Sequence, residues 1–332
     1  IEAERAYRQA LILQPGFAGA QLNLAKLLMA LGQIEFDQQR YPQALEYYHE
    51  AVQLLPHSPD AWSGLGYSLH SLERYAEAEN AYRQALSIEP KHLIAKFHLG
   101  RLLVQINQSE LAIPYLREVS SSQPDHWPSQ IWLCKAMTDL SLISEALKHI
   151  VKAEQLQPDR QDIASMKLFT MNYLPDISTE ELYIAHLDCT QRLYAQFYPK
   201  NLQYANTPTP ERLLKIGYVS ADLRGHAIAF FIRSPLTYHN RDRFEIHVFY
   251  NHYTSDAITE DLKELVDQWH PVFHLKDERL MQLIQEIGID ILIDLSGHSD
   301  FHRLQLFAHK PAPVQATWLG YLGTTGLATM DY

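Results

Sequence analysis

The stretch PDAWSGLGYSLHSLERYAEAENAYRQALSIEPKH, residues 59–92, decides the fold of the first half of the chain. Gly66 and Ala78 are small enough to let two helices approach closely, and Trp62 and Tyr82 are large enough to fill the space beside them. Prolines recur every 34 residues at the ends of similar segments: Pro56, Pro90, Pro124 and Pro158. A helix pair of this length cannot bury its apolar face alone, so the period predicts a stack of pairs.

The order of a large residue, Leu-Gly, Ala, an aromatic residue, Ala and Pro is typical of the tetratricopeptide repeat. Later copies keep the same positions in phase: Leu99, Gly100, Ala112, Leu133, Ala146 and Ala153. An earlier copy fits if about seven extra residues near 34–40 lengthen the turn between its two helices. We therefore predict a helical solenoid over residues 1–160, and such arrays usually bind extended polypeptide on their concave face.

The repeat fades after Pro158, and the next segment indicates a connector over residues 161–210. We expect helices over Asp162–Tyr173 and Thr179–Tyr198, with Asp176 or Ser178 as the N-cap of the second. The segment NTPTP, residues 206–210, is stiff and polar. We place the domain boundary near it.

Strands and helices alternate from Leu214 onward, which predicts a parallel sheet with helices on both faces, a Rossmann-like lobe over residues 211–332. The lobe contains no GxGxxG motif and so no dinucleotide fingerprint. The expected strands are Lys215–Ser220, Phe244–Tyr250, Val272–Leu275, Ile289–Leu295 and Val314–Leu319. The expected helices are Ile228–Thr237, Ile258–Gln268, Glu278–Ile287 and Phe301–Ala308.

Three polar, glycine-containing loops follow predicted strands: residues 220–226 (SADLRGH), 296–299 (SGHS) and 320–326 (GYLGTTG). Ligands of open parallel sheets bind beyond the carboxyl ends of the strands. These loops therefore form the candidate site.

Four stretches resemble the SPINDLY / O-GlcNAc transferase family in order and spacing: MNYLPDIS, KIGYVSADLRGHAIAFF, GIDILIDLSGH and KPAPVQATWLGYLGTTGLATMDY. The resemblance implies the N-terminal part of a two-lobed (GT-B type) enzyme that transfers a sugar from UDP-GlcNAc or GDP-fucose to Ser or Thr of protein acceptors, which the repeats recruit. We expect GlcNAc as the sugar, no cofactor or metal, and no turnover by this part alone, because the nucleotide-binding lobe of the family lies beyond it.

The resemblance also assigns site residues. His226 matches a general base or orienting group, and Asp222 matches the acid that holds or activates it or begins a water relay. Sugar-lining positions are His298, Leu319, Gly320, Thr324, Thr325 and Gly326. The residues leave structural alternatives open, because Asp222 also suits a turn and His298 a bond to a loop carbonyl. Leu322 departs from the proline that the family usually has there.

In the O-GlcNAc transferase family that this chain resembles, asparagines recur as a ladder on the concave face of the repeats. Only Asn23 keeps it here, since Gly64, His98 and Trp132 occupy the equivalent positions. Two alternatives to a GlcNAc transferase stay open: a peptide-binding scaffold with a degenerate catalytic lobe, and a protein O-fucosyltransferase.

Composition excludes several other classes of protein. The net charge of -11 and the lack of a basic run argue against nucleic acid as a partner. No apolar run is long enough for a membrane span, and no targeting signal is visible, so we expect a cytoplasmic protein. Neither HExxH, paired CxxC nor EF-hand spacing occurs, which gives no support for a metal site.

Overall fold

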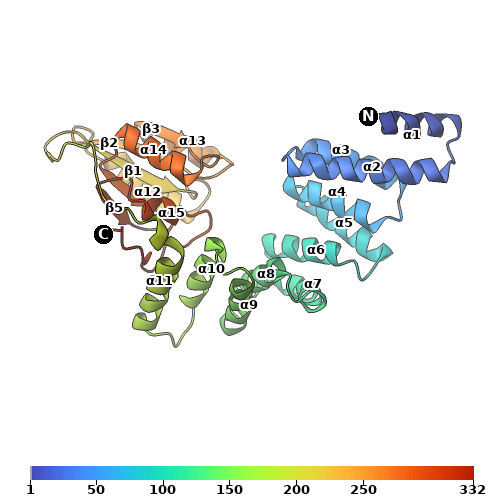
Figure 1. Ribbon diagram of the computed structural model, residues 1–332, viewed down its shortest axis with the longest axis horizontal. Helices are drawn as coiled ribbons and strands as arrows, with labels where there is room; N and C mark the ends of the chain where they lie inside the picture. The colour runs from blue at the N-terminus through green and yellow to red at the C-terminus, as the bar shows by residue number, and fades with distance from the viewer. Residues whose placement is uncertain (1) are drawn as a thin grey trace. The chain divides into compact units, whose positions relative to one another are not determined.

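The computed structural model describes residues 2–332, and the chain divides into two compact units between Leu156 and Gln157 (Figure 1). The first unit consists of helices. Their bounds are α1 Glu2–Leu13, α2 Ala18–Asp37, α3 Tyr41–Leu54, α4 Pro59–Ser71, α5 Tyr75–Ile88, α6 Leu93–Gln105, α7 Ser109–Ser122, α8 Trp127–Asp139 and α9 Ile143–Leu156.

Consecutive helices of the first unit form antiparallel pairs, α2 with α3, α4 with α5, α6 with α7 and α8 with α9. The first helices of neighbouring pairs also contact one another, and they do so more extensively than the second helices do. The first helices therefore form the more closely spaced, inner row of the solenoid, and α3, α5, α7 and α9 form the outer row. The predicted solenoid is confirmed.

Close packing explains why small residues stand at two positions of α4. A Cβ atom on Gly66 would lie 2.6 Å from the ring of Tyr82, and one on Gly64 would lie 2.1 Å from the ring of Tyr48. Tyr82 is fully buried. Each glycine thus leaves room for an aromatic ring of the partnering or preceding helix.

The extra residues near 34–40 do not lengthen a turn, as predicted, but a helix. Helix α2 has 20 residues, whereas α4, α6 and α8 have 13 each. The segment from Leu31 to Asp37 contains no proline and only one glycine, so nothing in it stops helix propagation. The helix ends where Gln39 adopts a left-handed conformation, with φ of 59°.

The second unit begins with α10 (Gln161–Met171), α11 (Thr179–Tyr194) and a 3-10 turn, η1 (Ala195–Phe197). The capping box of α11 is built on Ser178, one of the two predicted caps: its side chain accepts from the Glu181 N–H, and the Glu181 carboxylate accepts from the Ser178 N–H.

A sheet of five parallel strands follows, in the spatial order β3-β2-β1-β4-β5. The strands are β1 Leu214–Ser220, β2 Phe244–Tyr250, β3 Gln268–Pro271, β4 Ile291–Asp294 and β5 Val314–Thr317. The helices between them are α12 Ala227–Tyr238, α13 Ala257–Lys263, α14 Asp277–Ile287 and α15 Leu304–Ala308. The predicted Rossmann-like architecture is confirmed.

Two of the predicted elements are displaced. The helix expected over Ile258–Gln268 ends at Lys263, and β3 begins at Gln268 rather than at Val272. Gln268–Pro271 pair in register with His247–Tyr250, and Trp269 packs against the core of that face. The helix expected from Phe301 begins at Leu304, because Phe301 has a φ of 58°, which a helix cannot contain.

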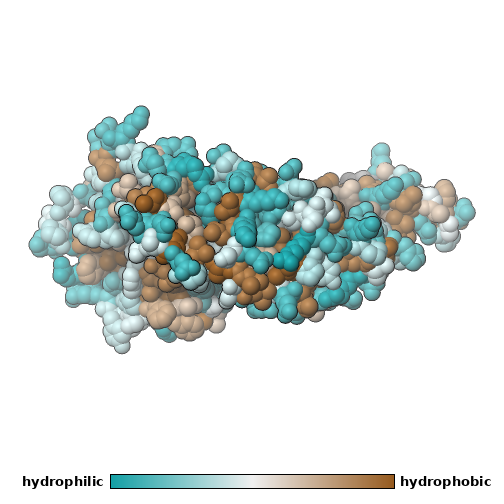
Figure 2. Space-filling view, turned by 90° about the horizontal axis from the view of Figure 1, so that it is seen from below, coloured by the Kyte–Doolittle hydropathy of each residue, from teal (hydrophilic) through white to brown (hydrophobic). Residues whose placement is uncertain are grey.

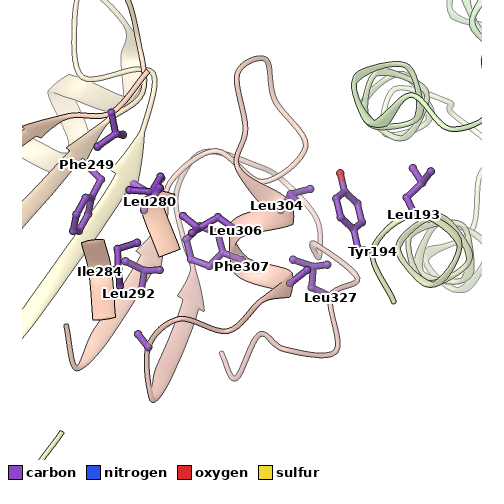
Figure 3. Close-up of a cluster of buried hydrophobic side chains, with 14 of the residues drawn as sticks. Leu193, Tyr194, Phe249, Leu280, Ile284, Leu292, Leu304, Leu306, Phe307 and Leu327 are labelled. Atoms are coloured by element: carbon purple, nitrogen blue, oxygen red, sulfur yellow. The ribbon is translucent and has the colours of Figure 1, made fainter. Parts of the chain in front are cut away.

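Alternating residues of the strands feed two cores, one on each face of the sheet. Ile216 and Tyr218 of β1 pack toward α12 and α13, and Val219 packs toward the opposite face. On that opposite face, Leu193 and Tyr194 of α11 join the same cluster as Phe307 and Leu327 (Figure 3). The segment predicted as a connector therefore contributes to the core of the second unit, and the division of the chain lies before it rather than near residues 206–210.

On the face shown in Figure 2, hydrophilic residues cover much of the surface, with hydrophobic patches between them. Among residues 2–332, no helix combines the length and the apolar character that crossing a bilayer requires.

Candidate functional site

The strand order creates a switch point between β1 and β4. From β1 the chain moves outward through β2 to β3, and it then returns to the other side of β1 for β4 and β5. The loops after β1 and β4 border this switch point at the carboxyl edge, which is where such sheets bind ligands. Two of the three predicted site loops flank this switch point.

Asp294 fixes the loop that leaves β4. Its carboxylate is buried and accepts hydrogen bonds from the N–H groups of Ser296 and Gly297, at 3.0 and 2.8 Å, and from the hydroxyl of Thr317 at 2.9 Å. Burial raises the pKa of this carboxyl group, while the three donors oppose that rise. Asp294 thus has a structural role.

Asp222 and His226 both lie on the loop after β1. The hydroxyl of Ser220 accepts from the Asp222 N–H at 3.0 Å, which turns the chain as it leaves the strand. The Asp222 side chain is almost buried, and this burial raises its pKa, although the nearby His226, Arg224 and His252 act to lower it. His226 is exposed. The loop therefore brings a shielded carboxyl group and an accessible imidazole together.

The contact of His226 with the backbone limits what its ring can do. His226 is the N-cap of α12, and its Nδ1 accepts from the Ile228 N–H at 3.3 Å. A neutral imidazole that accepts at Nδ1 carries its proton on Nε2. The free edge of this ring is therefore a hydrogen-bond donor, which favours the orienting role of His226 over the role of general base.

Aromatic residues from three further loops meet at the same carboxyl edge of the sheet. His252 and Tyr253 follow β2, Phe273 follows β3, and Phe301 follows β4. The Tyr253 ring lies 5.5 Å from that of Phe273 and 6.4 Å from that of Phe301, between ring centres, and the ring of His252 stacks on Tyr253 at 4.4 Å. Tyr253, Phe273 and Phe301, the aromatic border, are all exposed. Sequence reasoning missed them, because only the parallel pairing of β3, β2, β1 and β4 brings their loops together.

His298, predicted to contact the sugar, is instead locked inside the protein. Its Nε2 donates to the carbonyl of Thr325 at 2.9 Å, so its Nδ1 accepts from the hydroxyl of Ser165 at 2.8 Å. Burial and the neighbouring His302 lower its pKa to about 3. Both nitrogens are occupied and only 2% of the surface of His298 is exposed, so this residue joins the loop after β4 to α10. Its role is the structural one that the sequence left open, a hydrogen bond to a loop carbonyl.

Leu319 and Gly320 form a tight turn after β5. The Gly320 N–H donates to the Trp318 carbonyl at 2.9 Å, and Leu319 has a φ of 75°, so the turn is a γ-turn of the rare, strained kind. A Cβ atom on Gly320 would lie 1.7 Å from the carbonyl oxygen of Leu295. Only glycine lets this turn approach the end of β4, which explains the glycine that the sequence places there.

Thr324, Thr325 and Gly326 do not share one environment. Thr324 is exposed, and its hydroxyl accepts from the Gly326 N–H at 3.1 Å. Thr325 is buried, and the Gly326 carbonyl accepts from the hydroxyl of Thr190 in α11 at 2.6 Å. Of the three, only Thr324 presents its side chain to solvent.

Tyr321 organises the contacts between this loop and the helices α10 and α11. Its hydroxyl donates to Nε2 of His186 and accepts from the Asn172 side chain, each at 2.8 Å. A Cβ atom on Gly297 would lie 2.3 Å from Tyr321, so the loop after β4 also packs against it. The family-like stretches around Asn172 and Tyr321 are thus joined by a hydrogen bond, although they lie far apart in sequence.

Residues 144–332, more than half of the chain, match the profile of Glycosyl transferase family 41. The chain belongs to this family. Two tetratricopeptide-repeat profiles match residues 29–92 and 69–130 of this family 41 protein, which agrees with the observed helix pairs. The resemblance stated from the sequence is therefore confirmed at the level of the family.

Several plant proteins and one bacterial structure are similar to the chain. The probable UDP-N-acetylglucosamine--peptide N-acetylglucosaminyltransferase SPINDLY of Solanum lycopersicum is 35% identical over 170 residues, which is 50% of this chain and 18% of that protein. The probable SPINDLY protein of Arabidopsis thaliana is 34% identical over 170 residues, which again is 50% of this chain and 18% of that protein. A mutant of the Thermobaculum terrenum O-GlcNAc transferase superposes with a TM-score of 0.63 at 28% identity, covering 94% of this chain and 53% of that chain.

The chain thus spans about one fifth of the length of the curated SPINDLY relatives. Among the residues that the structure describes, no group of three or more His, Cys, Asp or Glu side chains is arranged to hold a metal ion.

Proposed function

We propose that this family 41 chain is part of a protein O-glycosyltransferase that transfers GlcNAc from UDP-GlcNAc to Ser or Thr hydroxyls of protein acceptors, with the repeats binding the acceptor. The observation that carries the proposal is the pair formed by shielded Asp222 and exposed His226 on the loop beside the switch point. Family membership and the names of the relatives support the class of reaction.

In the proposed reaction the acceptor hydroxyl oxygen bonds to the anomeric carbon of the sugar as the bond from that carbon to the phosphate oxygen breaks. The nucleoside diphosphate leaves with the bonding electrons, and the hydroxyl proton passes to the Asp222 carboxylate, directly or through water. The raised pKa of Asp222 supports this role, because it makes the carboxylate a stronger base than an exposed aspartate.

His226 supplies a donor in this scheme. Its Nε2–H orients an oxygen of the sugar or of the acceptor, because Nδ1 already accepts from the Ile228 N–H. The aromatic border, Tyr253, Phe273 and Phe301, offers apolar faces against which a sugar ring or an acceptor side chain packs. Leu319, Gly320 and Thr324 line the other edge through backbone groups and one hydroxyl.

Sugar transfer by the full-length protein tests the proposal. We expect His226→Ala to lower the transfer rate about tenfold or more, and His226→Gln, which keeps an N–H donor, to recover part of the loss. His274→Ala is the matched control, because His274 is an exposed histidine in the loop after β3. Equal transfer rates for wild type and His226→Ala would contradict the proposed role of His226.

The donor is tested in the same assay by offering labelled UDP-GlcNAc and labelled GDP-fucose in parallel. Transfer of GlcNAc supports the proposal, and transfer of fucose alone would replace it with the protein O-fucosyltransferase. Peptide binding without transfer from either donor would instead identify a scaffold with a degenerate lobe.

A further inference from the structure

A row of large planar side chains runs along the inner helices of the repeat unit. The ring of Phe36 in α2 stacks on Tyr67 in α4 at 4.0 Å, and Tyr67 stacks on His98 in α6 at 4.3 Å, between ring centres. Trp132 continues the row on α8. Four successive first helices thus contribute one large planar side chain each to the same row.

Arg101 of α6 lies within this row as a cation held by two rings. Its guanidinium carbon is 5.6 Å from the ring centre of Tyr67 and 5.8 Å from that of Trp132. The amine of Lys135 lies over the same Trp132 ring at 5.2 Å. Because each ring belongs to a neighbouring repeat, the stacking fixes the guanidinium in place before any ligand arrives.

The Arg101 guanidinium has no carboxylate partner within the described part of the chain. Its Nε is buried without a hydrogen-bond partner, and no hydrogen bond joins its two terminal nitrogens to residues 2–332. By contrast, Arg74, Arg83 and Arg117 of the repeats are each paired with a glutamate.

We infer that Tyr67, Arg101 and Trp132 form an anion subsite on the inner row, which binds the carboxylate of an Asp or Glu side chain in an extended acidic polypeptide. A planar guanidinium matches the two oxygens of a carboxylate, and such charge-assisted bonds are stronger than neutral ones. The chain as a whole carries a net charge of -11, so an acidic polypeptide is not attracted by overall charge. The subsite therefore selects by local chemistry.

The polypeptide occupant follows from the arrangement of the row. The rings recur once in each of four repeats, which suits an extended polymer with side chains at intervals better than a small, compact ligand. The inference rests on the proposed acceptor binding by the repeats, but it does not require sugar transfer. A failure of one can therefore be told from a failure of the other.

The test compares two fluorescein-labelled Gly/Ser peptides that differ only in carrying glutamates or glutamines at alternate positions. Binding to the full chain is followed by fluorescence anisotropy. We expect the glutamate peptide to bind at least about tenfold more tightly than the glutamine peptide, and the preference to shrink as salt is raised. Equal affinities for the wild-type chain would overturn the inference and need no variant to interpret.

The variants locate the effect. Arg101→Ala should reduce the preference for glutamate about tenfold, and Arg101→Lys should recover only part of it, because lysine keeps the charge but lacks the planar fork. Arg83→Ala is the matched control: it removes the same charge from α5 in the outer row, where Arg83 is paired with Glu79. Circular dichroism confirms that each variant is folded. A preference that survives in folded Arg101→Ala, or that Arg83→Ala abolishes, would refute the subsite.

Discussion

Replacing His298 by phenylalanine should destabilise the second unit by an amount that depends on pH. The substitution keeps a ring of similar size but removes both hydrogen bonds of the imidazole, to the Ser165 hydroxyl and the Thr325 carbonyl. Ser165 and Thr325 are both almost fully buried, so water cannot replace the lost partner. Each orphaned group costs about 1–3 kcal/mol, which gives a total loss of about 3 kcal/mol at pH 7.

The pH dependence comes from the lowered pKa of His298, about 3 in the folded protein against 6.5 for an unperturbed histidine. As pH falls below 6.5, the unfolded chain binds a proton at this residue and the folded chain does not. The wild type therefore keeps this contribution above pH 6.5 and loses it progressively as pH falls toward 3. Between pH 7 and pH 5 the wild type loses about 2 kcal/mol of its free energy of unfolding through this residue, and His298→Phe, which has no imidazole there, does not lose it.

The stability gap between wild type and His298→Phe should thus narrow from about 3 kcal/mol at pH 7 to about 1 kcal/mol at pH 5. Urea denaturation at the two pH values, followed by tryptophan fluorescence, measures the gap. Other buried histidines titrate in both proteins, and their contributions cancel in the difference.

Ser165→Ala is the control for this experiment. It removes one hydrogen bond of His298 but leaves the buried imidazole in place, so it should cost about 1 kcal/mol and keep most of the pH dependence of the wild type. A gap for His298→Phe that stays constant between pH 7 and pH 5 would refute the reasoning, because it would mean that His298 titrates alike in the folded and unfolded chains.

Three further predictions follow from the same structure. Gly320→Ala should lower the stability by more than about 3 kcal/mol, because its Cβ would overlap the Leu295 carbonyl, whereas Gly16→Ala, where a Cβ meets nothing within 4 Å, should be tolerated; thermal unfolding of both variants checks this. Ser178→Ala removes the capping box of α11 and should cost about 1 kcal/mol in urea denaturation, and an unchanged midpoint would contradict the role of the cap. The transfer rate of the full-length protein should fall with decreasing pH as the Asp222 carboxylate, whose pKa is raised by burial, becomes protonated. The Asp222→Asn variant should transfer sugar slowly, and its rate should not show this fall at acidic pH. Because we expect transfer to use no metal, EDTA should change the rate of neither protein.

The two folds and most element positions could be predicted from local patterns. Residues 59–92 carry the repeat in their own side chains, and Phe244–Tyr250 alternate so regularly that the predicted and observed strand bounds coincide. The failures have specific causes. The helix expected to extend to Gln268 gives way to a strand, because pairing of Gln268–Pro271 with β2 outweighs the helical pattern.

The candidate site could be predicted only in part. Asp222 and His226 share one loop, so their proximity follows from the sequence, and the structure adds that the ring of His226 presents a donor. His298 resembled a site residue because it stands in a polar loop after a strand. Its partners, Ser165 and Thr325, lie 133 and 27 residues away along the chain, so no local pattern could reveal that its nitrogens are occupied.

Local patterns of residues specify the helix pairs, the alternating strands and the glycines that close approach requires, because each of these depends on residues within about one repeat or one strand–loop–helix unit. Contacts between distant segments depend instead on the packing of the chain: α10 and α11 on the core of the sheet, Tyr253 beside Phe273 and Phe301, and Arg101 between the rings of two neighbouring repeats. Strand order and helix stacking set those encounters, and both are properties of the whole packed chain rather than of any segment.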